Sequence, residues 1–181
     1  MKCLTRLLCA SALLVSVAFA ESLDETRKKA EAGDAIAQHR LGLTYYEGNG
    51  VIKDATEAAK WIRTSAEQGY AEAQAYLGHM YRKGDGVIRD AAESAKWIRA
   101  SAEGGYAVAQ YNLAVMYEEG FHGVIKRDIV EAHAWYNLAS SGGDRNAKEV
   151  LGDIEKEMTR EQIYEATSLA KIYFAKLPKT K

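Results

Sequence analysis

Paired carboxylates recur at one spacing along this sequence, an aspartate followed three residues later by a glutamate. Two carboxylates can perform general acid and base catalysis when they face each other across a cleft. The same spacing also marks the start of a helix, because aspartate accepts a free backbone N–H and glutamate can reach back to the cap residue. We interpret the pairs as helix caps. They are Asp54 and Glu57, Asp90 and Glu93, and Asp128 and Glu131.

Two glycine-rich turns and four histidines are the other groups that could do chemistry. The turns GNG at 48–50 and GDG at 84–86 lack the Lys-Ser/Thr of a phosphate-binding loop, and no strand precedes them. We interpret them as helix stops, because glycine adopts the left-handed conformation that ends a helix. His39 and His79 could approach each other on neighbouring helices, but no third ligand accompanies them and no HExxH spacing occurs. We predict no metal, no cofactor and no catalytic residue.

The carboxylates and glycines belong to a segment that the chain repeats. Residues 35–70 and 71–106 align without a gap and are identical at 23 of 36 positions. A third copy, residues 107–144, is two residues longer because GFHGVIKRD replaces GNGVIKD. In each copy, small and apolar residues recur at helical spacing before the glycines and again after the aspartate. The sequence therefore predicts three helix pairs and an all-α fold.

The segments that flank the repeats differ from them, because the ends of a repeat array must cover its last apolar face. We predict an N-terminal capping helix within residues 21–34 and a C-terminal helix pair within residues 145–177. Thr159 and Gln162 are expected to cap the last helix, and Pro178 to end it. Residues 178–181 are expected to form a flexible tail.

The first 20 residues have the features of a secretory signal. Lys2 and Arg6 precede an apolar run that ends in Ala-Phe-Ala, and the run is too short to span a bilayer. We expect export to the periplasm and no stable membrane insertion. Cys3 and Cys9, the two cysteines of the chain, both lie in this segment, so packing rather than disulfides must stabilise the exported part. The net charge of −1 gives no indication of nucleic-acid binding.

The repeated pattern resembles a known family. It reads A-x-A-x-x-x-L-G-x-x-Y, G-x-G-V-x-x-D, A-x-x-W and A-x-x-G, and it is similar to the Sel1-like repeat. The resemblance implies a right-handed α-solenoid of antiparallel helix pairs, related to tetratricopeptide repeats, that binds other proteins. Ala114 departs from the family pattern, which has glycine there. Some secreted members carry disulfides between paired helices, which this chain cannot form.

The resemblance places the first helix of each pair on the concave face of the superhelix. Positions that are identical between the copies serve the shared packing, whereas positions that vary are free to contact a partner. Tyrosine and arginine at such positions are suited to protein recognition, although an ordinary solvated face is the alternative. The predicted protein-binding residues are Ile36, His39, Leu43 and Tyr46, then Glu72, Ala75, His79 and Arg82, then Val108, Tyr111, Val115 and Glu118. Phe121 and His122 of the inserted loop are a further candidate contact, unless Phe121 folds back onto the solenoid.

Two classes of function are open to such a chain. The first is an exported scaffold that binds another protein through its groove. The resemblance implies two forms of it: an immunity protein that neutralises a type VI secretion effector such as a phospholipase, or an envelope signalling regulator or adaptor. The second class, an enzyme such as a cell-wall hydrolase, needs a nucleophile with its base, a metal cluster or carboxylates in a cleft. We predict a non-enzymatic scaffold, and leave its oligomeric state open.

Overall fold

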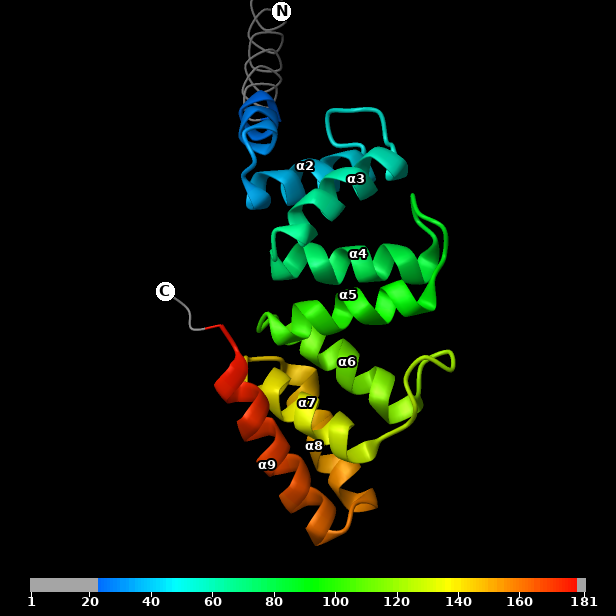
Figure 1. Ribbon diagram of the computed structural model, residues 1–181, viewed down its shortest axis with the longest axis vertical. Coiled ribbons are helices and arrows are strands. Elements are labelled where there is room, and N and C mark those ends of the chain that lie inside the picture. The colour runs from blue at the N-terminus through cyan, green and yellow to red at the C-terminus, as the bar shows by residue number, and fades with distance from the viewer. Residues whose placement is uncertain (1–22, 179–181) are drawn as a thin grey trace, which may run out of the picture.

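The computed structural model describes residues 23–178 and stacks antiparallel helix pairs along one axis (Figure 1). Over these residues the chain is all-α and forms the right-handed solenoid that we predicted. The predicted signal peptide, and the predicted tail beyond Pro178, lie outside the described residues. After a first helix over residues 23–31 come α2 (Ala35–Glu47) with α3 (Ala55–Glu67), α4 (Ala71–Lys83) with α5 (Ala91–Glu103), α6 (Ala107–Glu119) with α7 (Ile129–Ser141), and then α8 (Arg145–Ile154), η1 (Glu155–Glu157) and α9 (Arg160–Lys176).

Aspartates begin the second helix of each pair, as predicted. Asp54 Oδ1 accepts the backbone N–H of Thr56 at 2.9 Å and that of Glu57 at 3.0 Å, and Asp90 and Asp128 cap α5 and α7 in the same way. The expected reach of the glutamates back to the cap is wrong. The backbone N–H of Asp54, which Glu57 would accept, donates instead to the Tyr45 carbonyl of α2 at 2.9 Å, and Glu57 accepts from Lys60 Nζ at 2.8 Å.

A complete capping box occurs at the start of α9, where we predicted one. The Thr159 hydroxyl accepts the Gln162 N–H, and the Gln162 side chain accepts the Thr159 N–H. This last helix packs on α7. Tyr173 stacks on Trp135 with ring centroids 4.7 Å apart, and its hydroxyl donates to Glu131 at 2.9 Å.

Glycines stop α2 and α4, and another glycine allows α4 to approach α5 closely. Gly48 and Gly84 end α2 and α4 in the left-handed conformation, with φ of 81° and 83°, which glycine adopts without steric cost. Within the helices, a Cβ at Gly78 would lie 2.8 Å from the Ile98 side chain of α5. The paired helices are therefore as close as a glycine permits.

Serine and glutamine side chains join the helices at equal spacing along the array. The Ser65 hydroxyl of α3 donates to the Ala35 carbonyl at 2.6 Å, and the Ser101 hydroxyl of α5 donates to the Ala71 carbonyl at 2.5 Å. Three glutamines reach back to the end of the preceding helix at 3.0–3.1 Å. These bonds run from Gln38 to the Ala30 carbonyl, from Gln74 to the Ala66 carbonyl and from Gln110 to the Ala102 carbonyl.

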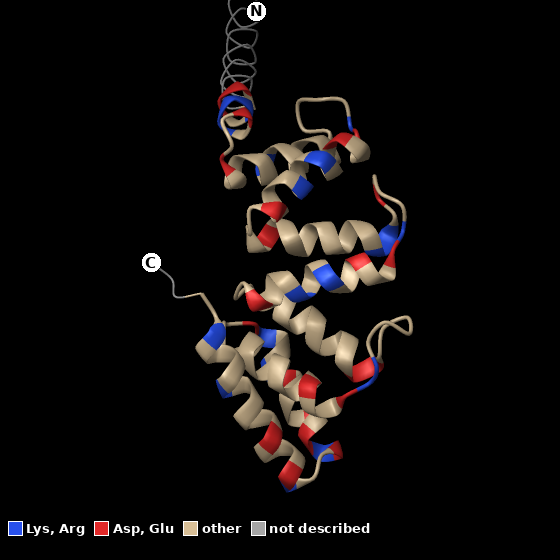
Figure 2. Cartoon of the chain, viewed as in Figure 1, with Lys and Arg blue, Asp and Glu red and all other residues tan. Residues whose placement is uncertain are grey.

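Acidic and basic residues are interspersed over the helices in Figure 2. Acidic residues mark several helix starts, where the free N–H groups favour negative charge. Within residues 23–178, no helix combines the length and the apolar character that crossing a membrane requires.

Candidate functional site

Three equivalent gaps lie beside the first helices of the repeats, and several of the predicted binding residues border them. The first gap, between α2 and α4, is filled by aromatic rings. Tyr46 and Tyr76 pack edge to face with centroids 5.5 Å apart, and the Tyr46 hydroxyl donates to Asp85 Oδ2 at 2.8 Å. His39 is only 8% exposed because the rings of Tyr70 and Tyr76 pack against it. His39 and Tyr46 thus contact the next repeat of their own chain.

Burial shifts the pKa values of two groups in this aromatic cluster. It lowers the pKa of His39, since the charged imidazolium is poorly solvated there, although the Glu72 carboxylate acts in the opposite direction. Burial also raises the pKa of Tyr76 to about 12. His39 is therefore neutral and the tyrosine is a phenol at neutral pH.

The third gap, beside α6, is filled as well. Tyr136 of α7 is 1% exposed, its ring packs against Tyr111 with centroids 5.4 Å apart, and its hydroxyl donates to Glu118 Oε2 at 2.6 Å. Burial, and then the hydrogen bond to Glu118, raise the pKa of Tyr136. The predicted residues Tyr111 and Glu118 therefore hold a tyrosine of their own repeat.

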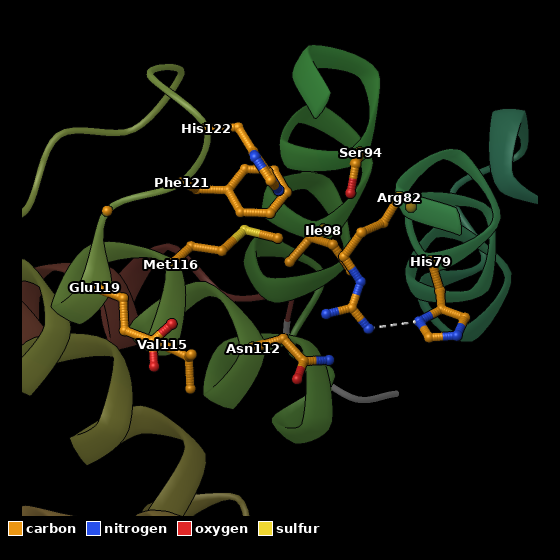
Figure 3. A pocket seen from close by; sticks show the side chains of 12 residues that line it. His79, Arg82, Ser94, Ile98, Asn112, Val115, Met116, Glu119, Phe121 and His122 are labelled. Atoms are coloured by element: carbon orange, nitrogen blue, oxygen red, sulfur yellow. Dashed lines mark hydrogen bonds between the residues drawn. The ribbon is translucent and has the colours of Figure 1, made fainter. Parts of the chain in front are cut away.

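The central gap, between α4 and α6, is open. It forms a pocket of about 440 Å³ above α5, which we call the central pocket (Figure 3). Five predicted residues from two repeats and the inserted loop meet in it. They are His79 and Arg82 of α4, Val115 of α6, and Phe121 and His122 of the loop; the other lining residues are Gly78, Ser94, Ile98, Asn112, Met116, Glu119 and Gly120.

Differences between the copies explain why this gap is open. Asn112 of α6 occupies the position that Tyr76 has in α4, so the ring that fills the first gap is missing. Ile98 of α5 occupies the position that Tyr136 has in α7, so the ring that fills the third gap is missing too. Arg82 replaces Tyr46, and it bonds to its own helix rather than to the next loop.

The charges at the mouth of the pocket are set by Arg82 and His79. The Nη2 atom of Arg82 lies 3.0 Å from the Nδ1 atom of His79 (Figure 3). Burial, followed by the positive charges of Arg82 and Lys83, lowers the pKa of His79. The imidazole is therefore neutral at neutral pH and accepts the hydrogen bond from the guanidinium, which remains the cation at this edge of the pocket. Glu119 brings a carboxylate to the other side.

Ser94 lies at the floor of the central pocket and was not predicted. Its side chain is fully buried, and its Oγ has no hydrogen-bond partner. Figure 3 shows the hydroxyl directed toward the side of the pocket where Ile98 and Arg82 lie. The other two copies have alanine at this position, Ala58 and Ala132. That difference between copies was the signal available in the sequence.

The inserted loop closes one side of the pocket. The Phe121 N–H donates to the Ile125 carbonyl at 2.9 Å, and the Phe121 ring packs against the hydrophobic core. Phe121 therefore folds back onto the solenoid, which was the alternative that the sequence left open. His122 is exposed and has a φ of 45°.

The remaining predicted residues lie outside the central pocket. Ile36 and Val108 are each 47% exposed, and Leu43 and Ala75 are half-buried. Glu72 is exposed and accepts the Tyr70 hydroxyl at 2.8 Å. In the part of the chain that the structure describes, no three histidine, cysteine, aspartate or glutamate side chains are grouped to hold a metal ion.

Comparison with known proteins identifies the repeats. The family model described as the Sel1 repeat matches residues 35–70, 71–106 and 107–144, which together are more than half of the chain. The chain belongs to the Sel1 repeat family. Repeats of this family typically mediate protein–protein interaction.

Two solved structures share the fold. A Sel1 repeat protein from Oxalobacter formigenes has a TM-score of 0.68 and 39% identity, over 73% of this chain and 98% of that chain. A protective antigen of uropathogenic Escherichia coli strains that displays an SLR fold has a TM-score of 0.63 and 29% identity, over 87% of this chain and 41% of that chain.

One curated relative matches over a short stretch. The secretory immunoglobulin A-binding protein EsiB of Escherichia coli O6:H1 is 45% identical over 42 residues, which are 23% of this chain and 9% of EsiB. The chain thus matches a small part of that protein's length.

Proposed function

We propose that this Sel1 repeat protein is a non-enzymatic scaffold that binds another protein along the face formed by α2, α4 and α6. The observation that carries the proposal is the central pocket, which brings together residues that vary between the repeats. The pocket combines apolar walls with an arginine and an asparagine at its edge. Such a mixture of apolar, polar and charged groups occurs at protein interfaces.

Catalysis is less well supported by the groups in the pocket. The Ser94 hydroxyl has no hydrogen-bond partner, so it lacks the base that activates a serine nucleophile. Burial, followed by the charge of Arg82, lowers the pKa of His79, and the hydrogen bond to Arg82 does not align the imidazole on a nucleophile. These groups can recognise a ligand, which is the role that we assign to them.

The fuller proposal places the scaffold in the periplasm, where it acts as an immunity protein or as an envelope regulator. The support is the secretory pattern of the first 20 residues and the family resemblance. The EsiB name shows that a protein sharing a Sel1 segment with this chain binds an immunoglobulin. The identity of the bound protein separates the two roles: an immunity protein captures a toxic effector, whereas a regulator captures a signalling protein of the envelope.

The test is affinity capture from an envelope extract, followed by titration of the purified partner. Arg82→Glu reverses the charge at the pocket edge, and Arg89→Glu is the matched control, because Arg89 is exposed and lies outside the lining residues. We expect the parent and Arg89→Glu to bind one partner equally and Arg82→Glu to bind at least tenfold more weakly. Equal binding by Arg82→Glu would move the interface away from this face.

A further inference from the structure

Tyrosine rings fill the first and the third gap, whereas the equivalent central gap is open and forms the central pocket. Resting on the proposed scaffold function, we propose that the central pocket receives a tyrosine side chain of the partner protein. The neighbouring gaps show how such a ring is bound. The ring of Tyr76 fills the first gap and packs against Tyr46, and the ring of Tyr136 fills the third gap and packs against Tyr111. The partner supplies the ring that Asn112 and Ile98 do not.

The walls of the pocket suit an aromatic ring. Ile98 lies at the floor, and Met116 and Phe121 stand on the side of α6 and the loop (Figure 3). Aromatic rings pack well against thioether and aromatic side chains, because both are polarizable and tolerate edge contacts. A ring inserted here makes the kind of contact that Tyr136 makes with Tyr111 one repeat later.

The polar groups select a phenol over a plain ring. Ser94 Oγ is buried at the floor without a partner, and a phenol hydroxyl can both donate to it and accept from it. At the edge, Arg82 presents a guanidinium to the same space. This chain already pairs arginine with tyrosine hydroxyls twice, Arg63 with Tyr81 at 2.8 Å and Arg99 with Tyr117 at 2.9 Å.

Other side chains fit less well. A phenylalanine or leucine makes no hydrogen bond to the buried Ser94 hydroxyl, so it lacks the stabilisation that a tyrosine hydroxyl gains there. A lysine or arginine brings a second cation to Arg82. An aspartate can pair with Arg82 but leaves the apolar walls of Met116 and Phe121 uncovered.

The probe is N-acetyl-tyrosinamide, compared with the phenylalanine and leucine amides, titrated into the protein and followed by two-dimensional NMR of the backbone amides. We expect saturable shifts at Ser94, Ile98 and Phe121 from the tyrosine amide, with affinity about fivefold higher than for phenylalanine, as one hydrogen bond provides. Equal affinity for the leucine amide, or shifts that do not saturate or lie elsewhere, would overturn the proposal.

Two variants test the pocket with residues that the other repeats already use. Asn112→Tyr installs the Tyr76 ring of the first repeat and should abolish the shifts, with circular dichroism confirming that the helices persist. Ser94→Ala installs the alanine of both other repeats. It should leave the affinity for the phenylalanine amide unchanged and lower the affinity for the tyrosine amide to about the same value. Undiminished tyrosine-specific shifts in both variants would refute the assignment.

The capture experiment separates this proposal from the scaffold function on which it rests. If Arg82→Glu abolishes capture but the tyrosine amide shows no preference over phenylalanine, the scaffold stands and the tyrosine proposal fails. If the partner is captured equally by the parent and by Asn112→Tyr, the partner does not anchor in the central pocket and the tyrosine proposal again fails. Support requires a tyrosine preference in the pocket and loss of capture when Asn112→Tyr fills it.

Discussion

Replacing Ser94 with alanine should stabilise the protein. Ser94 is fully buried in α5 and its hydroxyl has no hydrogen-bond partner, so folding removes a polar group from water without compensation. The matched control is Ser101→Ala on the same helix. Ser101 is equally buried, but its hydroxyl donates to the Ala71 carbonyl at 2.5 Å. The same chemical change should therefore have opposite signs at two positions seven residues apart.

The magnitudes follow from the cost of an unpaired buried hydroxyl. Desolvation of such a group costs about 1–3 kcal/mol, and the small void left by the oxygen offsets part of the gain. We expect Ser94→Ala to raise the free energy of unfolding by about 1 kcal/mol. Ser101→Ala removes a made hydrogen bond and should lower it by about 1 kcal/mol. For a chain of this size each change corresponds to about 2–4 °C in Tm.

Thermal and urea unfolding, followed by far-UV circular dichroism, measure both variants. The expected result is a Tm above the parent for Ser94→Ala and below it for Ser101→Ala, with the two separated by about 4–8 °C. If Ser94→Ala is as destabilising as Ser101→Ala, the Ser94 hydroxyl has a structural hydrogen bond. That result would refute the reasoning that leaves it free for a ligand.

Three further predictions concern the packing and the protonation of the core. Gly78→Ala should lower the free energy of unfolding by about 1–3 kcal/mol, because the new Cβ would lie 2.8 Å from an isoleucine of the paired helix. Gly152→Ala in α8, where no atom lies within 4 Å of the new Cβ, should raise the free energy of unfolding by about 0.5–1 kcal/mol. Urea unfolding measures both changes. Tyr136→Phe removes the hydrogen bond to the Glu118 carboxylate and should lower the free energy of unfolding by about 2 kcal/mol. The free energy of unfolding should also fall as the pH drops from the ordinary histidine pKa of 6.5 toward the lower pKa of folded His39, because the unfolded imidazole takes a proton before the buried one. His39→Gln should reduce this pH dependence in a series of urea titrations.

Each of these predictions has an opposing outcome. If the two glycine substitutions change the free energy of unfolding equally, helix propensity rather than the contact with α5 determines the effect of Gly78→Ala. A neutral Tyr136→Phe would mean that solvent screens the hydrogen bond to Glu118. An unchanged pH profile in His39→Gln would assign the acid sensitivity to other groups.

The local features of the fold could be predicted from the sequence because each depends on a few neighbouring residues. Asp54 and its equivalents cap the next helix, Gly48 and Gly84 end one, and Thr159 with Gln162 begins α9. The family pattern follows from the same repeated positions. The glutamates were the exception, since the Asp54 N–H that Glu57 would accept donates to the Tyr45 carbonyl of the preceding helix.

The sequence by itself determined that this chain is an array of helix pairs, and that certain positions on the first helices vary between copies. It did not determine which of these positions border open space. That depends on whether a side chain of the neighbouring helix fills the gap, as Tyr76 and Tyr136 do and Asn112 and Ile98 do not. Such contacts join residues more than 20 positions apart, so only the packing of helices within and between the repeats places the open pocket at the centre.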